Sequence, residues 1–174
     1  MKRLSLIPIL VVTLAVLSTS CSKDNPVAPA NDNLVQFKAT LLPANEVPPI
    51  TNAESVGSGS ANVDFFLTRD SAGAIASGLV NFRVDVTGYP ATTAITASHI
   101  HPGAAGVNGS VLVSANVAAG EVVLTNGAVT YFRGGVAISA ANAQAIINNP
   151  AGFYFNVHTT LNSGGVMRGQ LVKQ

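Results

Sequence analysis

The sequence predicts an all-β domain, a Greek-key-like antiparallel sandwich or barrel with one short helix near residues 139–148. About eight short apolar stretches recur at roughly ten-residue spacing, which is typical of such folds. Glycine, proline or asparagine bounds most of these stretches. The chain also has sixteen glycines, nine prolines and no tryptophan, a composition that favours strands joined by turns over a helical bundle.

The expected strands follow the chain in order. The first is Leu34–Leu41, which Pro43 ends. Residues 45–49 are expected to be irregular, because consecutive prolines cannot donate hydrogen bonds to a sheet. The other expected strands are residues 60–67, 74–86, 93–101, 110–117, 121–132, 153–159 and 166–172, with turns at 69–73 and 162–165.

Two of these elements have the clearest local signals. Within residues 74–86, four apolar side chains at alternate positions share one face and polar ones share the other, as in a half-buried antiparallel strand. In residues 139–148, Ser139 can cap a helix, several alanines favour it, and Pro150 stops it.

Residues 1–20 are predicted to be a lipoprotein-type signal peptide. Lys2 and Arg3 precede an apolar run at 4–17, and small residues follow before Cys21. The run is shorter than the roughly 20 residues that a membrane-spanning helix needs, so a permanent span is the weaker interpretation. An ordinary secretory signal with an incidental cysteine is the other alternative.

Cys21 is the only cysteine, so no disulfide can form within the chain. Small residues ending in one cysteine resemble the lipobox of bacterial lipoproteins, which implies a lipid on Cys21 and attachment to a membrane. Ser22 at the next position is similar to lipoproteins sorted to the outer membrane. We therefore expect a lipidated Cys21 and flexible tether at 21–33, a domain at 34–174, and a location in the cell envelope, at the outer membrane or cell surface.

The charge pattern excludes one class of partner. Without Lys2 and Arg3, seven basic residues stand against eight acidic ones, and neither sign is clustered. Nucleic-acid binding therefore has no electrostatic basis in this sequence. A protein or another extracellular ligand remains as an expected partner, its identity open.

Three histidines are the candidate metal ligands. His99 and His101 are two residues apart in a predicted strand, so their side chains share a face with Cα atoms about 6.5–7 Å apart. His158 lies in another predicted strand and shares its face with Tyr154 and Asn156, opposite the apolar side chains. Imidazole ligands suit zinc or copper far better than calcium. The alternative is that these histidines only form hydrogen bonds within the fold.

Glu46 and Arg168 are two of the few charges within distinctive segments. Glu46 is a candidate fourth metal ligand, or an ion-pair partner for Arg168, or a solvated loop carboxylate. The sequence contains no Gly-x-Ser-x-Gly elbow, no His-Glu-x-x-His motif and no phosphate-binding loop. No catalytic residue or reaction is therefore assigned.

Five groups of residues, taken in order, resemble the CHRD domain, the module named after chordin and found in bacterial envelope proteins. Val166 stands where the family commonly has a glutamate, two residues before Arg168. The resemblance implies an extracellular β module. The matching groups are residues 37–42 with 45–49, residues 98–103, residues 108–109, residues 154–159 and residues 168–171.

A looser likeness to copper/zinc superoxide dismutase rests on the His-x-His strand and the later strand histidine. Three histidines are too few for a complete two-metal site of that kind. Three hypotheses follow. We favour a lipid-anchored binding or structural module whose candidate metal site is formed by the three histidines; the alternatives are a copper- or zinc-dependent redox enzyme and a purely adhesive module.

Overall fold

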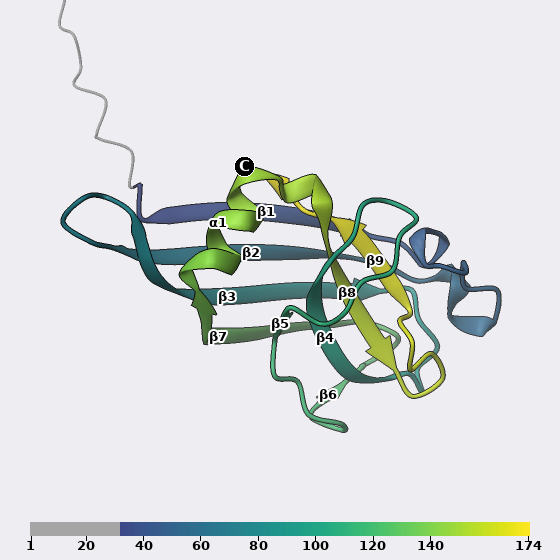
Figure 1. The fold of residues 1–174 in the computed structure, drawn as a ribbon. Helices are drawn as coiled ribbons and strands as arrows, with labels where there is room; N and C mark the ends of the chain where they lie inside the picture. Colours follow the sequence, from purple (N-terminus) through teal and green to yellow (C-terminus); the bar gives the residue numbers. More distant parts are fainter. Residues whose placement is uncertain (1–31) are drawn as a thin grey trace, which may run out of the picture. The chain divides into compact units, whose positions relative to one another are not determined.

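The computed structural model describes residues 32–174, and everything below refers to that part of the chain. The expected signal peptide, Cys21 and nearly all of the expected tether lie outside it. The described residues form two antiparallel sheets with one α-helix, which confirms the predicted all-β sandwich (Figure 1).

The first sheet has the strand order β10-β1-β2-β3-β7, and every pairing in it is antiparallel. Its strands β2 and β3 are joined by a short turn, as antiparallel neighbours allow, whereas β7 joins β3 after the chain has passed through β4, β5 and β6. Their bounds are Leu34–Leu41 for β1, Ser58–Arg69 for β2, Ile75–Thr87 for β3, Val129–Ser139 for β7 and Val172–Lys173 for β10.

The second sheet has the order β5-β4-β8-β9, and β6 pairs with the beginning of β4. Its two longest strands, β4 and β8, are antiparallel neighbours although about fifty residues separate them, and they carry the three histidines. The bounds are Ala94–Pro102 for β4, Val113–Ser114 for β5, Val122–Val123 for β6, Phe153–Thr159 for β8 and Met167–Gln170 for β9.

Four short helical segments complete the described fold. The α-helix α1, Ala140–Asn148, begins where Ser139 Oγ accepts a hydrogen bond from Asn142 N at 3.2 Å, the predicted cap. It buries Ala143 and Ile146 and crosses the first sheet beside β3 and β7 (Figure 1). The 3₁₀ turns are η1 Pro43–Asn45, η2 Ala53–Val56 and η3 Pro150–Gly152.

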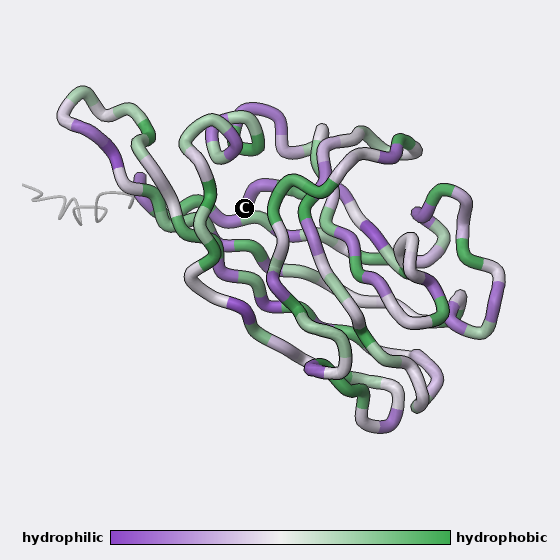
Figure 2. Tube along the Cα trace, turned by 60° about the horizontal axis from the view of Figure 1, so that its bottom comes forward, coloured by the Kyte–Doolittle hydropathy of each residue, from purple (hydrophilic) through white to green (hydrophobic). Residues whose placement is uncertain are grey.

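The core lies between the sheets and follows from alternation along the strands. In β3, the predicted apolar face is buried, and the polar residues between its members are not. The same alternation of hydrophobic and hydrophilic segments is visible along the chain trace (Figure 2). Phe82 of the first sheet packs on Phe155 of the second, with ring centroids 5.7 Å apart, so aromatic side chains join the two layers.

The sheets also meet at one corner through the backbone. Leu42, just after β1, exchanges two hydrogen bonds with Arg168 of β9, at 3.2 and 3.4 Å. A Cβ atom at Gly169 would overlap the carbonyl of Thr40, so only glycine lets β1 and β9 approach this closely. This corner fixes β9, and therefore Arg168, relative to the loop that carries Glu46.

Three predicted strands are wrong in extent. Residues 166–172 are split at Leu171 into β9 of the second sheet and β10 of the first. Residues 110–117 form only the two-residue β5, because Asn116 adopts a positive φ of 54° and ends the pairing. Residues 121–132 are broken after β6 by a two-residue turn at Asn126-Gly127, with φ of 53° and 77°. Asn-Gly is the preferred pair for such a turn, because both of its residues need positive φ.

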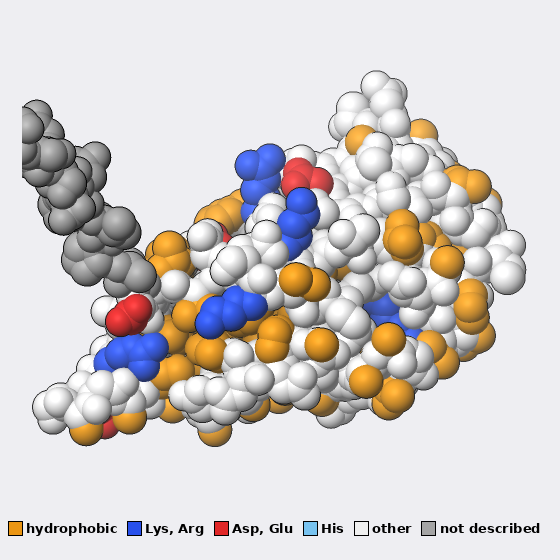
Figure 3. Space-filling view, turned by 90° about the horizontal axis from the view of Figure 1, so that it is seen from above, with side chains coloured by type: hydrophobic (Ala, Val, Ile, Leu, Met, Phe, Trp, Pro, Cys, Tyr) orange, Lys and Arg blue, Asp and Glu red, His pale blue; other side chains and the backbone are white. Residues whose placement is uncertain are grey.

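The surface has few charges on the face seen from above, where Lys and Arg lie scattered among apolar and uncharged side chains (Figure 3). Among the described residues, no helix is both long and apolar enough to cross a membrane.

Candidate metal centre

The pairing of β4 with β8 places the three histidines on one face of the second sheet. In this register Ala97 is opposite His158, and His99 is opposite Asn156. Directly opposed residues share a face, and so do residues two apart. Ile100 and Phe155 therefore point into the core from the other face, where both are fully buried. The expected orientation of His158, away from the apolar interior, agrees with this register.

The three side chains converge. Each offers one ring nitrogen, and these three atoms lie within 4.8 Å of one another. The closest approach joins His99 Nδ1 and His158 Nε2, at 3.2 Å. The ring centroid of His101 is 5.5 Å from that of His99 and 6.1 Å from that of His158. The structure thus brings the candidate ligands from two separate strands to a common point.

Backbone carbonyls fix the tautomers of two histidines. His158 Nδ1 lies 3.0 Å from Ser163 O, and His101 Nδ1 lies 3.1 Å from Gly109 O. Because a carbonyl oxygen only accepts, each Nδ1 must carry the proton, and each Nε2 keeps its lone pair. This is the arrangement in which metal-binding histidines are usually held, with the second nitrogen donating to a carbonyl or carboxylate.

The two Nε2 atoms are in different situations. That of His158 accepts from His99 Nδ1, since only one of the two nitrogens can carry the proton between them. That of His101 is buried and has no hydrogen-bond partner. An unsatisfied buried polar atom costs about 1–3 kcal/mol, which a metal bond to this nitrogen would relieve. The donor set therefore fits a metal ion.

Burial keeps all three imidazoles neutral. Burial, together with weaker electrostatic repulsion from His158 and His101, lowers the pKa of His99 to about 4. Burial also lowers the pKa values of His101 and His158, although backbone hydrogen bonds partly oppose this. A neutral imidazole is the form that binds a metal, so no proton has to leave these side chains at neutral pH.

The loop after β4 supports His101 through one residue, Gly109. Gly109 accepts the His101 proton at its carbonyl and donates its N–H to the Tyr154 hydroxyl at 3.2 Å. The Tyr154 ring stacks on His101 with centroids 5.0 Å apart and planes 5° apart. A Cβ atom at Gly109 would overlap the Pro102 carbonyl, so glycine is required for this contact.

Glu46 lies with Arg168 and not among the histidines. Its Oε2 is 3.7 Å from Arg168 Nε, and both side chains are buried. Desolvation raises the pKa of Glu46 to about 7, although the Arg168 charge opposes the shift. Of the alternatives for Glu46, the ion pair matches this geometry, and the group of potential metal ligands among the described residues does not include it.

Arg168 joins three parts of the site. Its Nε donates to Asn45 O at 2.7 Å, and its Nη1 donates to Asn108 Oδ1 at 2.8 Å. Its guanidinium also lies over the Tyr154 ring, 4.7 Å from the centroid. Arg168 therefore connects the Glu46 loop to the loop that holds His101.

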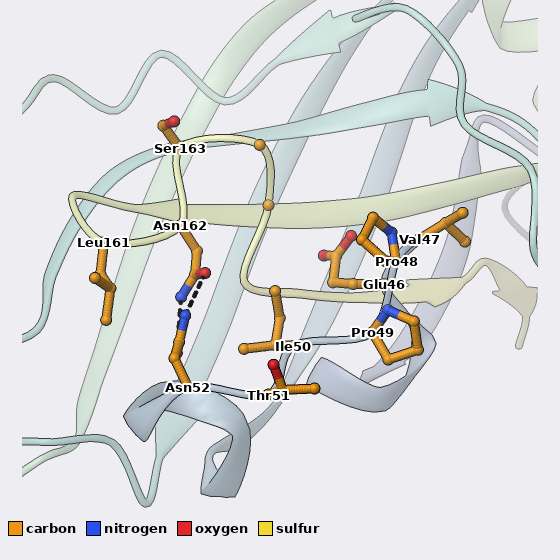
Figure 4. A pocket seen from close by; sticks show the side chains of 12 residues that line it. Glu46, Val47, Pro48, Pro49, Ile50, Thr51, Asn52, Leu161, Asn162 and Ser163 are labelled. Atoms are coloured by element: carbon orange, nitrogen blue, oxygen red, sulfur yellow. Dashed lines mark hydrogen bonds between the residues drawn. The ribbon is translucent and has the colours of Figure 1, made fainter.

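A pocket of about 370 Å³ opens beside Glu46. Figure 4 shows it between the segment from Pro48 to Asn52 and the turn from Leu161 to Gly165, which joins β8 to β9. Asn52 and Asn162 close one end with a hydrogen bond of 2.8 Å. The turn from Leu161 to Gly165, which lines one side of the pocket, also contains Ser163, whose carbonyl accepts the hydrogen bond from His158 Nδ1.

The sequence interpretation missed several residues of the site. Ser163 and Gly109 act through backbone carbonyls, which no side-chain pattern reveals. Glu54, a buried carboxylate that bonds residues around β4 and β8, was not recognised at all. Its only sequence signal is an acidic residue in a stretch with few charges, two positions after Asn52, whose side chain caps η2.

The family model described as CHRD domain matches residues 37–171. No curated protein and no solved structure matches the chain.

Proposed function

The chain belongs to the CHRD domain family, and we propose that its domain is a binding module in which His99, His101 and His158 hold one zinc or copper ion. One observation carries this proposal. Three neutral imidazoles from two strands converge, and carbonyls hold His101 and His158 in the tautomer whose unprotonated Nε2 can coordinate a metal.

The geometry supports a transition-metal ion. With metal–nitrogen bonds of about 2.0–2.1 Å, His99 Nδ1 and His158 Nε2, which are 3.2 Å apart, would subtend about 100° at the ion, close to the tetrahedral angle. This coordination requires the His99 proton to move from Nδ1 to Nε2. A purely hydrogen-bonding role accounts for the contact between His99 and His158. This role leaves the buried Nε2 of His101 without a hydrogen-bond partner, whereas a bound metal ion would coordinate that nitrogen.

The described residues supply three ligands of the usual kinds at this point, and no fourth. Sites with three protein ligands keep a coordination position for water or an exchangeable ligand, whereas structural zinc sites are closed by four. We therefore propose a site that binds a further small ligand on the metal. The ion would supply Lewis acidity, and copper would add redox chemistry.

The test is metal content. The full-length chain is loaded with zinc or copper, dialysed against buffer and measured by elemental analysis beside the double variant His99→Ala/His101→Ala. We expect one ion per chain in the wild type and none in the variant. Equal content in both proteins would refute the site and leave a module that binds without a metal.

The redox alternative is tested separately. Superoxide turnover by the copper-loaded protein that disappears in the double variant would assign an enzyme. Turnover equal to that of free copper in buffer would contradict that assignment.

We also propose that Cys21 is lipidated and attaches the domain to a membrane of the cell envelope. The support is the sequence pattern around Cys21. Membrane fractionation of the Cys21→Ser variant tests it, with release to the soluble fraction expected. Unchanged membrane association would contradict lipidation.

A further inference from the structure

Glu54 is a buried carboxylate that does not belong to the group of three possible metal ligands described above. It lies in η2, and its exposed fraction is 3%. Acidic side chains are rarely buried to this extent unless donors surround them. Three side-chain donors do so here, from residues far away in the sequence.

Two of these donors lie at the ends of the two histidine strands. Thr93, directly before β4, donates to Oε1 at 2.9 Å. Thr159, the last residue of β8, donates to Oε2 at 2.6 Å. One carboxylate therefore connects the strand of His99 and His101 to the strand of His158.

The third donor lies in the turn after β8. Asn162 Nδ2 donates to Glu54 Oε2 at 2.6 Å, and its backbone N–H donates to Thr159 Oγ1 at 3.0 Å. Asn52, the cap of η2, holds the other end of the same amide at 2.8 Å. Asn162 is thus fixed at its side chain and its backbone.

The next residue in the chain is Ser163, whose carbonyl accepts the proton of His158 Nδ1. The position of this carbonyl decides which nitrogen of His158 is protonated, and therefore whether Nε2 can bind a metal. A continuous path of hydrogen bonds and one peptide link runs from Glu54 through Asn162 and Ser163 to His158.

From this path we propose that Glu54 is a positioning residue of the metal site, which holds the Ser163 carbonyl where it fixes the tautomer and orientation of His158. The role rests on the metal-binding function proposed above. Outer residues that orient metal ligands typically contribute about 10–100-fold to metal affinity.

Glu54→Gln is the direct test because it keeps the size of the side chain. A carboxylate gives two acceptor oxygens, whereas the amide gives one, so at least one of the three donors must face an NH₂ group. Glu121→Gln is the matched control. It makes the same chemical change at an exposed carboxylate that pairs with Arg133.

Metal affinity and a metal-free readout are both measured. We expect the zinc dissociation constant of full-length Glu54→Gln to rise about 10–100-fold at a temperature where it remains folded, and that of Glu121→Gln to stay unchanged. In the metal-free proteins, long-range ¹H–¹⁵N NMR of the imidazole ring reports the tautomer of His158. The wild type should be protonated at Nδ1 alone, and Glu54→Gln should show a mixture of tautomers.

A second variant separates positioning from general stability. Asn162→Ala cuts the path and leaves Glu54 its two threonine donors, so its effect on affinity should not add to that of Glu54→Gln in the double variant. Additive effects would contradict a shared path through the turn.

The outcomes distinguish this inference from the proposed function. Affinity and tautomer in Glu54→Gln indistinguishable from those of the wild type would overturn the positioning role, with metal binding intact. A wild type that binds no metal, with the tautomer of His158 still dependent on Glu54, would refute the metal function and keep the positioning of His158.

Discussion

At the scale of single residues, the site is defined by which ring nitrogen of each histidine carries the proton. His101 and His158 are both protonated at Nδ1 by contact with carbonyls, and burial keeps all three histidines neutral. Histidine identity in the sequence suggests a metal. The fixed tautomers and the unpartnered Nε2 of His101 distinguish a site prepared for coordination from histidines that only hold turns.

The lowered pKa values predict how the metal-free protein responds to acid. Below the ordinary histidine pKa of 6.5, the histidines bind protons in the unfolded chain but stay neutral in the native state. For His99 this difference extends down to about pH 4. Since the unfolded state then binds more protons, the free energy of unfolding falls as the pH falls through this window. Urea unfolding of the metal-free protein at several pH values between 7 and 5 measures the effect.

Glu46 acts in the opposite direction. Its pKa is raised from 4.5 to about 7, so between these values the native state binds the extra proton and gains stability as the pH falls. Three histidines lower the free energy of unfolding in acid and one carboxyl group raises it, so we expect a net loss of stability as the pH falls. Glu46→Gln removes the opposing contribution and should make the loss steeper. A shallower loss in this variant would contradict the raised pKa.

At the scale of secondary-structure elements, the close approach of β9 to β1 at the sheet corner is testable, because it requires a glycine at position 169. Gly169→Ala should destabilise the protein by about 1–3 kcal/mol, because its Cβ would meet the Thr40 carbonyl where β9 joins β1. Gly164→Ala is the control, since a Cβ there meets nothing within 4 Å. Chemical denaturation of the two variants gives the comparison, and equal stabilities would contradict the requirement.

Alternation and turn residues made the long strands predictable. Leu34–Leu41 and Phe153–Thr159 have the predicted bounds, and the helix begins at its predicted cap. The break at Asn126-Gly127 was missed because the apolar residues on both sides were read as one strand, although Asn-Gly itself is a hairpin signal.

Less of the candidate site could be predicted. The sequence indicated the three histidines through strand spacing, and their meeting depends on the register of β4 with β8, which spacing alone does not give. The roles of Gly109, Ser163 and Glu54 depend on contacts between loops distant in the sequence, and no local pattern encodes such contacts.

At the scale of the whole molecule, metal binding should be coupled to stability. An ion that binds only the folded state adds RT ln(1 + [L]/Kd), about 2.7 kcal/mol at a free concentration of 100 Kd. The melting temperature of the full chain should therefore rise with zinc concentration, and that of His99→Ala/His101→Ala should not. An equal rise in both proteins would place the ion elsewhere.

The most direct measurement is X-ray absorption spectroscopy of the zinc-loaded protein, which reports the atoms around the ion and their distances. We expect three imidazole nitrogens at about 2.0–2.1 Å, with one oxygen ligand such as water completing the shell. A His158→Ala variant should show one imidazole fewer. A shell of oxygen atoms with one imidazole or none would show that the three histidines do not share an ion.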